Sequence, residues 1–283
     1  SLMIDDVMGN KPFTDPELEQ WRQLLTQRRD WLAQRGIRYL VVIPPDKHTI
    51  YPEHLPGWLA EAARPPQRLE QFVSHMKTRS DLPILDLRET LLAGKKNERV
   101  YLKTDTHWNE RGAFAASRAI VGRLAFMGMP VTAPAVSAFQ STLVDLPAGD
   151  LAMMLGREGS LGEKGEVIFE ARPPWPVIQP GRLDDPGKKW IPGTEPQVTE
   201  NPAATGRVVI FRDSFANSLM KFLGCSFSRV VYLWQQNWDK GIIEREKPDL
   251  VIDEMLERFL ISRNPGDLQS KDDQPGAQVF GER

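Results

Sequence analysis

An acid, a histidine and a serine are the residues of this 283-residue chain whose types and spacing could do chemistry. Asp105 and His107 stand two residues apart, and Ser214 follows an apolar run that begins at residue 208. In an extended segment, side chains two residues apart point the same way. Asp105 could therefore reach one imidazole nitrogen of His107 and leave the other nitrogen free as a base. A serine hydroxyl beside that nitrogen would be an activated nucleophile for acyl transfer.

Each of these features also has an interpretation without catalysis. An isolated Asp-x-His pair can be a surface ion pair, and Asn109 can cap the helix that follows it. A strand that ends in Asp-Ser before a helix also occurs in α/β proteins with no hydrolytic role. The combination favours catalysis, because acid, base and hydroxyl each lie at the end of a predicted strand. Open α/β sheets place their sites at such strand ends.

The elements that would position these residues alternate between helix and strand. This order predicts an α/β fold with a doubly wound, mostly parallel sheet flanked by helices. Thr14 and Glu17 form a capping box before a helical pattern that ends at Gly36. Buried strands are predicted at residues 37–43, 84–87, 207–211, 229–233 and 250–253, and further helices at 69–76, 109–124, 215–223 and 240–246.

We expect a single catalytic domain over residues 1–261, with an irregular insertion at residues 130–206 between the two halves of the site. Residues 147–206 are rich in proline and glycine, so that loops and short strands are expected there rather than sustained helix. Such a segment either lines a substrate groove or is a surface excursion. Residues 262–283 are polar and are predicted to be a flexible tail.

The composition is that of a globular protein, with 41% hydrophobic and 26% charged residues. A net charge of −2 lacks the basic excess that nucleic-acid binding needs, so no nucleic-acid partner is expected. No apolar run reaches the roughly 18 residues that would span a bilayer. The single cysteine, Cys225, excludes an internal disulfide, and no spacing of metal ligands is present, so we expect no metal. We also expect no cofactor, because no G-x-G-x-x-G stands between a strand and a helix.

These segments resemble those of the alginate O-acetyltransferase family, SGNH-hydrolase-like proteins that acetylate exported polysaccharide. In that family an Asp-x-His-Trp segment precedes the serine, as residues 105–108 precede Asp213-Ser214-Phe215 here. The stretch from Pro44 to Pro56 is similar to the family's Pro-x-Lys…Tyr-Pro-x-x-Leu-Pro pattern. The likeness covers about residues 20–125 and 207–260.

The resemblance implies an O-acetyltransferase that moves acetyl groups to polysaccharide hydroxyls through an acetyl-serine intermediate. Ser214 would be the nucleophile, His107 the base and Asp105 the acid that orients the imidazole. The helix that follows Ser214 could supply oxyanion donors, first the Ser214 N–H and then Asn217. Asn217 could equally be an exposed helix residue. Arg212 departs from the pattern, because SGNH hydrolases have a glycine there.

Two further residues are candidates for substrate binding. Trp108 could stack on a pyranose ring or pack in the core. Lys47 could hold a polymer carboxylate, or it could form a structural salt bridge or be solvated. The same question arises for Trp175, Trp190, Trp234 and Trp238, and the sequence does not sort them.

The resemblance also implies a periplasmic or otherwise extracytoplasmic protein. The first residues, Ser-Leu-Met, resemble the remnant of an expression tag, so we expect that a signal peptide or membrane anchor was removed. A membrane-bound O-acyltransferase would then relay the acetyl groups. Two alternatives stay open: an SGNH-type carbohydrate acetylesterase, in which water attacks the acetyl-serine, and a non-catalytic polysaccharide-binding protein. The sequence does not define the oligomeric state.

Overall fold

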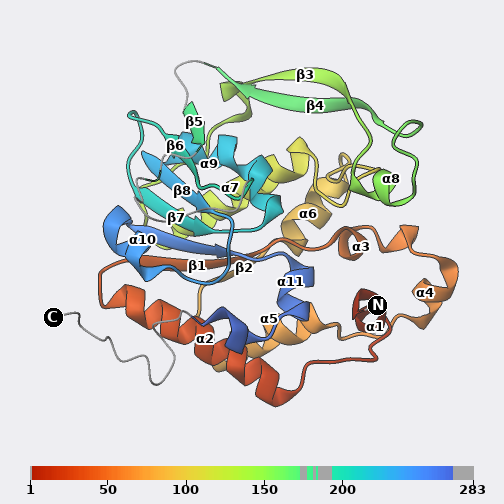
Figure 1. Ribbon diagram of the computed structural model, residues 1–283, viewed down its shortest axis with the longest axis horizontal. Helices are drawn as coiled ribbons and strands as arrows, with labels where there is room; N and C mark the ends of the chain where they lie inside the picture. The colour runs from red at the N-terminus through yellow and green to blue at the C-terminus, as the bar shows by residue number, and fades with distance from the viewer. Residues whose placement is uncertain (1, 173–176, 181–182, 184–192, 270–283) are drawn as a thin grey trace.

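A mixed sheet forms the centre of the fold (Figure 1) in a computed structural model that describes residues 2–172, 177–180, 183 and 193–269. Within these residues the sheet has seven strands in the order β2-β1-β9-β7-β8-β6-β5. The first five of these strands are parallel, whereas β6 is antiparallel to β8 and β5 is antiparallel to β6. Their bounds in that order are Ile84–Asp86, Arg38–Ile43, Leu250–Glu254, Arg207–Phe211, Arg229–Leu233, Gln197–Glu200 and Val177–Pro180.

Helices cover both faces of this sheet, which confirms the doubly wound α/β prediction (Figure 1). One face packs against α2 (Asp15–Ala33), α5 (Arg68–Arg79), α10 (Lys240–Glu246) and α11 (Glu257–Ser262). The other face packs against α6 (Arg88–Lys95), α7 (Glu110–Phe126) and α9 (Met220–Ser226). Alternate residues of each strand enter the two cores, as in β1, where Leu40 faces one core and Val41 the other.

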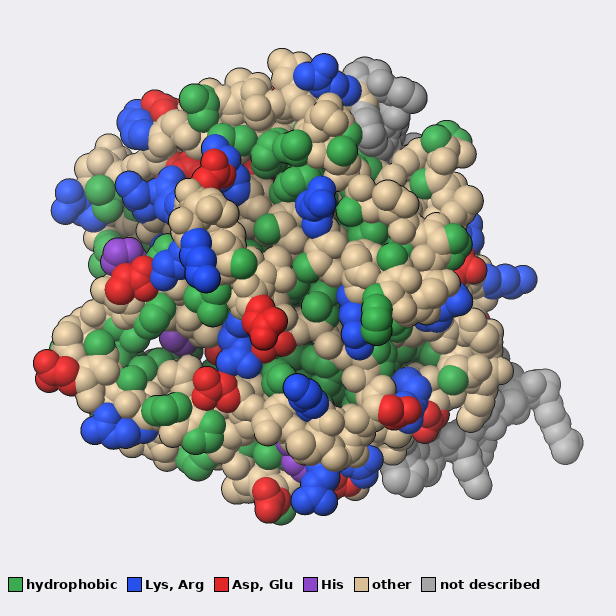
Figure 2. Space-filling model, turned by 180° about the vertical axis from the view of Figure 1, so that it is seen from behind, with side chains coloured by type: hydrophobic (Ala, Val, Ile, Leu, Met, Phe, Trp, Pro, Cys, Tyr) green, Lys and Arg blue, Asp and Glu red, His purple; other side chains and the backbone are tan. Residues whose placement is uncertain are grey.

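Short elements connect these layers. They are α1 (Leu2–Val7), α3 (Lys47–Ile50), the 3₁₀-helix η1 (Pro52–His54), α4 (Gly57–Ala62), η2 (Val136–Ala138), α8 (Asp150–Met154), η3 (Ser214–Leu219) and η4 (Pro265–Leu268). None of the helices in the described part of the chain is long and apolar enough to cross a membrane. Acidic and basic side chains are interspersed over the face seen from behind (Figure 2).

The insertion is more regular than predicted. β3 (Phe139–Leu146) and β4 (Glu163–Ala171) pair as an antiparallel ribbon outside the main sheet, with α8 in the connection between them (Figure 1). Phe139 and Phe169 of the ribbon pack against Phe222 of α9, with ring centroids 5.3 and 6.0 Å apart. At the other end of the ribbon, Glu163 accepts hydrogen bonds from the N–H and the hydroxyl of Thr104. Residues 173–176, 181–182 and 184–192, including Trp175 and Trp190, lie outside the described residues.

Two other predicted boundaries are wrong. The helix expected at residues 215–223 begins one residue earlier as the 3₁₀-helix η3 and becomes α-helical only at Met220. The flexible tail expected from residue 262 is ordered up to residue 268, where Leu268 is buried and its carbonyl accepts a hydrogen bond from Arg28. Residues 270–283 lie outside the described residues.

Candidate active site

Ser214 stands at the carboxyl end of β7, in the middle of the sheet, where the backbone turns sharply into η3. The preceding residue makes this turn, because Asp213 Oδ1 accepts the Phe215 N–H at 3.0 Å and Oδ2 accepts the Leu256 N–H at 2.8 Å. The Asp213 N–H donates to Glu254 Oε2 at 2.9 Å. Asp213 is therefore a helix cap that presents the half-buried Ser214 side chain above the strand ends.

Asp105 and His107 lie in a tight loop, not in the extended segment that their spacing predicted. The loop closes where the Leu102 N–H donates to the His107 carbonyl at 3.1 Å. Inside it, Asp105 Oδ1 accepts the His107 N–H at 2.9 Å and lies 2.6 Å from His107 Nδ1. This is the turn that an aspartate forms with the backbone two residues on. The same carboxylate oxygen therefore fixes both the backbone and the ring of His107.

The acid, the imidazole and the hydroxyl form a continuous chain. His107 Nε2 lies 2.7 Å from Ser214 Oγ, and Nδ1 is held by Asp105. Burial raises the pKa of Asp105, but hydrogen bonds from the ring and backbone of His107 and from the Asp150 N–H outweigh it and lower the pKa to about 2. Asp105 is therefore ionised at neutral pH, which favours the tautomer of His107 with its proton on Nδ1. Nε2 is then free to accept the proton of Ser214.

Two residues of the β3–β4 connection pack directly on the acid, and sequence reasoning missed both. A Cβ atom at Gly149 would lie 2.3 Å from Asp105 Cβ, so only glycine permits this approach. Asp150 donates its N–H to Asp105 Oδ2 at 3.2 Å and accepts the Thr106 N–H at 2.7 Å. The Gly-Asp dipeptide is a turn signal, but nothing in the sequence indicates that it approaches residue 105.

Asp105, His107 and Asp150 each offer a ligand atom within 4.8 Å of the others, a spacing that a metal ion could bridge. Both ring nitrogens of His107 already have partners, however, and the Asp150 carboxylate already binds Thr106. A metal ion here would have to replace these hydrogen bonds. We therefore interpret these three residues as part of the hydrogen-bonded arrangement of acid, base and hydroxyl, and not as a metal site.

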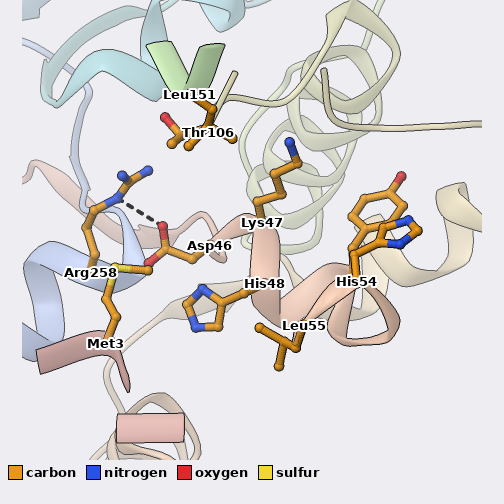
Figure 3. A pocket seen from close by; sticks show the side chains of 10 residues that line it. Met3, Asp46, Lys47, His48, His54, Leu55, Thr106, Leu151 and Arg258 are labelled. Carbon is orange, nitrogen blue, oxygen red and sulfur yellow. Dashed lines mark ion pairs between the residues drawn. The ribbon is translucent and has the colours of Figure 1, made fainter. Parts of the chain in front are cut away.

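Lys47 supports the loop that carries Asp105 by binding two of its backbone carbonyls. Its Nζ donates to the Lys103 carbonyl at 2.8 Å and to the Asp105 carbonyl at 3.0 Å, and burial lowers its pKa. Lys47 also lines a cavity of about 340 Å³ beside the loop (Figure 3), where Thr106 and Leu151 form part of the opposite wall. Thr106 lies between Asp105 and His107, so the cavity adjoins the candidate active site. Two of the three Lys47 donors are therefore occupied by the backbone.

Trp108 packs in the core and is not available to stack on a sugar. Its side chain is 1% exposed, and its Nε1 donates to the Phe215 carbonyl at 3.2 Å. The rings of Trp108 and Phe215 also meet edge to face at 5.0 Å. The substrate-binding alternative for Trp108 is therefore wrong, because the side chain is buried and bonds the His107 loop to η3.

Arg212, at the position where a glycine was expected, has a buried side chain that orients Asn217. Its Nη1 donates to Asn217 Oδ1 at 2.7 Å and to the Asp213 carbonyl at 3.2 Å, while burial lowers its pKa to about 10. A guanidinium only donates, so the Asn217 amide oxygen faces Arg212 and its NH₂ group faces away. Asn217 is exposed and lies three residues after Ser214, on the same side of the 3₁₀-helix.

The fold is similar to those of several solved structures. Bacillus cereus PatB1 with a sulfonyl adduct gives a TM-score of 0.67 at 16% identity, covering 90% of this chain and 92% of that chain. The O-acetyltransferase domain of Pseudomonas putida AlgJ gives a TM-score of 0.56 at 18% identity, covering 92% of this chain and 89% of that domain. At such identities the likeness establishes the fold alone.

The sequence also shows which family the chain belongs to. Residues 3–169 match the model of the family described as SGNH hydrolase-like domain, acetyltransferase AlgX, and this chain belongs to that family. The family resemblance seen in the sequence is thereby confirmed.

Curated relatives agree with this assignment. A Pseudomonas aeruginosa protein named "Probable alginate O-acetylase AlgJ" is 26% identical over 168 residues, which make up 59% of this chain and 38% of that protein. A protein of the same name from Pseudomonas syringae pv. tomato is 32% identical over 97 residues, 34% of this chain and 24% of that protein. The chain thus spans about two fifths or less of the length of these relatives.

Proposed function

We propose that this domain is an O-acetyltransferase that moves acetyl groups to the hydroxyls of a polysaccharide through an acetyl-Ser214 intermediate. The observation that carries the proposal is the pair of contacts made by His107, 2.7 Å to Ser214 Oγ and 2.6 Å to Asp105 Oδ1. These lie within the hydrogen-bonding range expected of a nucleophile, its base and an orienting acid. The names of the relatives support acetyl as the transferred group and alginate as the polymer.

The reaction takes place in two steps. Ser214 Oγ attacks the acetyl carbonyl of a donor while His107 Nε2 accepts the hydroxyl proton, and Asp105 stabilises the resulting imidazolium. The tetrahedral intermediate collapses, His107 returns the proton to the leaving group, and the acetyl ester remains on Ser214. A sugar hydroxyl then attacks this ester with His107 again as base, which forms the new acetyl ester and restores the Ser214 hydroxyl.

Two donors are suited to the oxyanion of each tetrahedral intermediate. The Ser214 N–H has no hydrogen-bond partner within the described part of the protein, whereas the next N–H, that of Phe215, is occupied by Asp213. The Asn217 NH₂ group is the second donor, because Arg212 holds the amide oxygen. Donors fixed before the reaction stabilise the developing charge without reorganisation.

Membership of the family supports a proposal about the acetyl donor and the place of action. We propose that the domain works outside the cytoplasm and receives acetyl groups from a membrane-bound O-acyltransferase. The expected acceptor is an extended polyuronate such as alginate. The cavity lined by Thr106 and Lys47 adjoins the loop that carries Asp105 and His107, and we propose that it holds part of the donor or the acceptor.

Transfer of labelled acetyl separates this proposal from its alternatives. The purified protein should move acetyl from nitrophenyl acetate to alginate oligosaccharides and should use acetyl-CoA poorly. Acetyl release to water without transfer would identify an esterase instead. Turnover of neither ester would favour a binding protein, and efficient transfer from micromolar acetyl-CoA would contradict the relay from a membrane enzyme.

A further inference from the structure

One exposed tryptophan follows the strand next to the one that leads to the nucleophile. Trp234 follows β8, the strand that pairs with β7, and the Arg212 N–H donates to the Leu233 carbonyl at 2.9 Å. Neighbouring strands are about 4.8 Å apart, so Trp234 stands at the same edge of the sheet as Ser214, beside Arg212. Its side chain is 38% exposed.

The indole of Trp234 is held from one side. The Arg212 guanidinium lies 4.2 Å from the ring centroid, and Arg212 itself is 2% exposed and bonded to Asn217. A cation over the face of an indole is attracted by the negative potential of the ring, and this attraction is stronger when the cation is desolvated. The ring is therefore fixed before any ligand arrives, and it keeps an exposed surface while the same guanidinium holds Asn217, the second proposed oxyanion donor.

The other tryptophans in the described part of the chain do not offer this combination. Trp21, Trp108 and Trp238 are buried, and Trp31 packs against Trp238 with ring centroids 6.1 Å apart. Trp58 is exposed, but it lies on α4, far along the fold from β8 (Figure 1). Isolated exposed aromatic residues are ordinary on protein surfaces. Trp234 differs because one buried arginine contacts both its ring and the amide of Asn217, three residues from the nucleophile.

We propose that Trp234 is the stacking platform for the acceptor sugar. The apolar C–H face of a pyranose would lie on the exposed part of the indole, with one ring hydroxyl directed at the acetyl group on Ser214. The C–H groups carry partial positive charge and suit the negative face of the ring. This inference rests on the proposed transferase function and adds the position of the acceptor, which is the side of the site next to Arg212.

The test is a comparison of acetyl transfer with simple ester hydrolysis in Trp234→Ala. Acetyl transfer to alginate oligosaccharides depends on the platform, whereas hydrolysis of nitrophenyl acetate needs only the triad and the oxyanion donors. The ratio of transfer to hydrolysis, measured below saturation with acceptor, should fall about tenfold, chiefly through a higher KM for the acceptor. Trp234→Phe should recover most of the loss, because it restores an aromatic face.

Phe126→Ala is the matched control. Phe126 is 83% exposed and also lies under an arginine, Arg123, at 5.5 Å, but it stands at the far end of α7. That helix begins next to His107, so Phe126 is about 24 Å from it along the axis. Phe126→Ala should leave the ratio unchanged.

Rates of transfer and hydrolysis that both stay at the wild-type level in Trp234→Ala would overturn the platform. So would an equal loss of transfer and hydrolysis, since the residue would then act only by supporting Arg212 and Asn217. Full ester turnover by Ser214→Ala would instead refute the proposed function, so the two failures can be told apart.

Discussion

Ser214→Ala and His107→Ala should each lower kcat for acetyl-ester turnover by roughly 10⁴–10⁶-fold while leaving the fold intact. Without Oγ there is no acyl acceptor, and without the imidazole the hydroxyl stays protonated. The half-buried positions of both side chains leave little packing to lose. Steady-state hydrolysis of nitrophenyl acetate measures the loss, and thermal melting followed by circular dichroism checks the fold.

The three residues should also behave as one unit. The double variant of Ser214 and His107 should be no slower than either single variant, because each change alone already removes the covalent route. Asp105→Asn should lose about 10⁴-fold, since an amide at this position favours the wrong tautomer of His107. A Ser214→Ala variant within tenfold of wild type, or losses that simply multiply, would contradict the assignment.

Asn217→Ala should lower kcat by roughly 10²–10³-fold, the usual effect of removing one oxyanion donor. Asn217→Asp is the sharper variant, because a carboxylate still accepts the hydrogen bond from Arg212 but has no NH₂ group to donate. It should be at least as slow as the alanine variant. The expected loss is in kcat for nitrophenyl acetate, with KM little changed.

The neighbouring Ser218→Ala provides a control in the same turn of η3. It should keep wild-type kcat, because the proposed donor set does not include Ser218. If Asn217→Asp turned over the ester at a rate close to wild type, Asn217 would be an exposed helix residue and the second oxyanion donor would have to be sought elsewhere.

The sequence was sufficient to predict the central strands and the meeting of His107 with Ser214. Continuous apolar runs such as residues 208–211 identify strands buried on both faces, and the carboxyl end of such a strand carries Ser214. The strand expected before Asp105 was wrong, because Tyr101 makes only an isolated bridge to Trp108. A loop brings His107 to Ser214 instead. The Asp105 loop was predicted in its contacts but not in its shape. An Asx turn and an extended segment both bring side chains two residues apart together, and the spacing does not distinguish them.

What the sequence did not reveal depends on contacts between distant segments. Gly149 and Asp150 reach Asp105 through the β3–β4 connection, which is held there by hydrogen bonds from Thr104 to Glu163 and from the Gly149 N–H to Thr104. The burial of Trp108 likewise depends on Phe215, more than a hundred positions later in the chain. In the sequence, Arg212 stood out only as a departure from the glycine of the SGNH pattern. In the structure the Arg212 side chain contacts both Asn217 and Trp234. The sequence did not predict these contacts, because it does not show which side chains lie beside Arg212.

The most direct test of the account is to trap the acyl-enzyme. The purified protein is mixed with nitrophenyl acetate, quenched in acid during turnover, digested and analysed by mass spectrometry. We predict one acetyl group on the peptide that contains Ser214, absent in His107→Ala. The label should leave the protein and appear on the glycan when alginate oligosaccharide is added before the quench. Ester turnover at the wild-type rate with no acetyl on Ser214, or with acetyl that the acceptor does not remove, would contradict an acetyl-serine transferase.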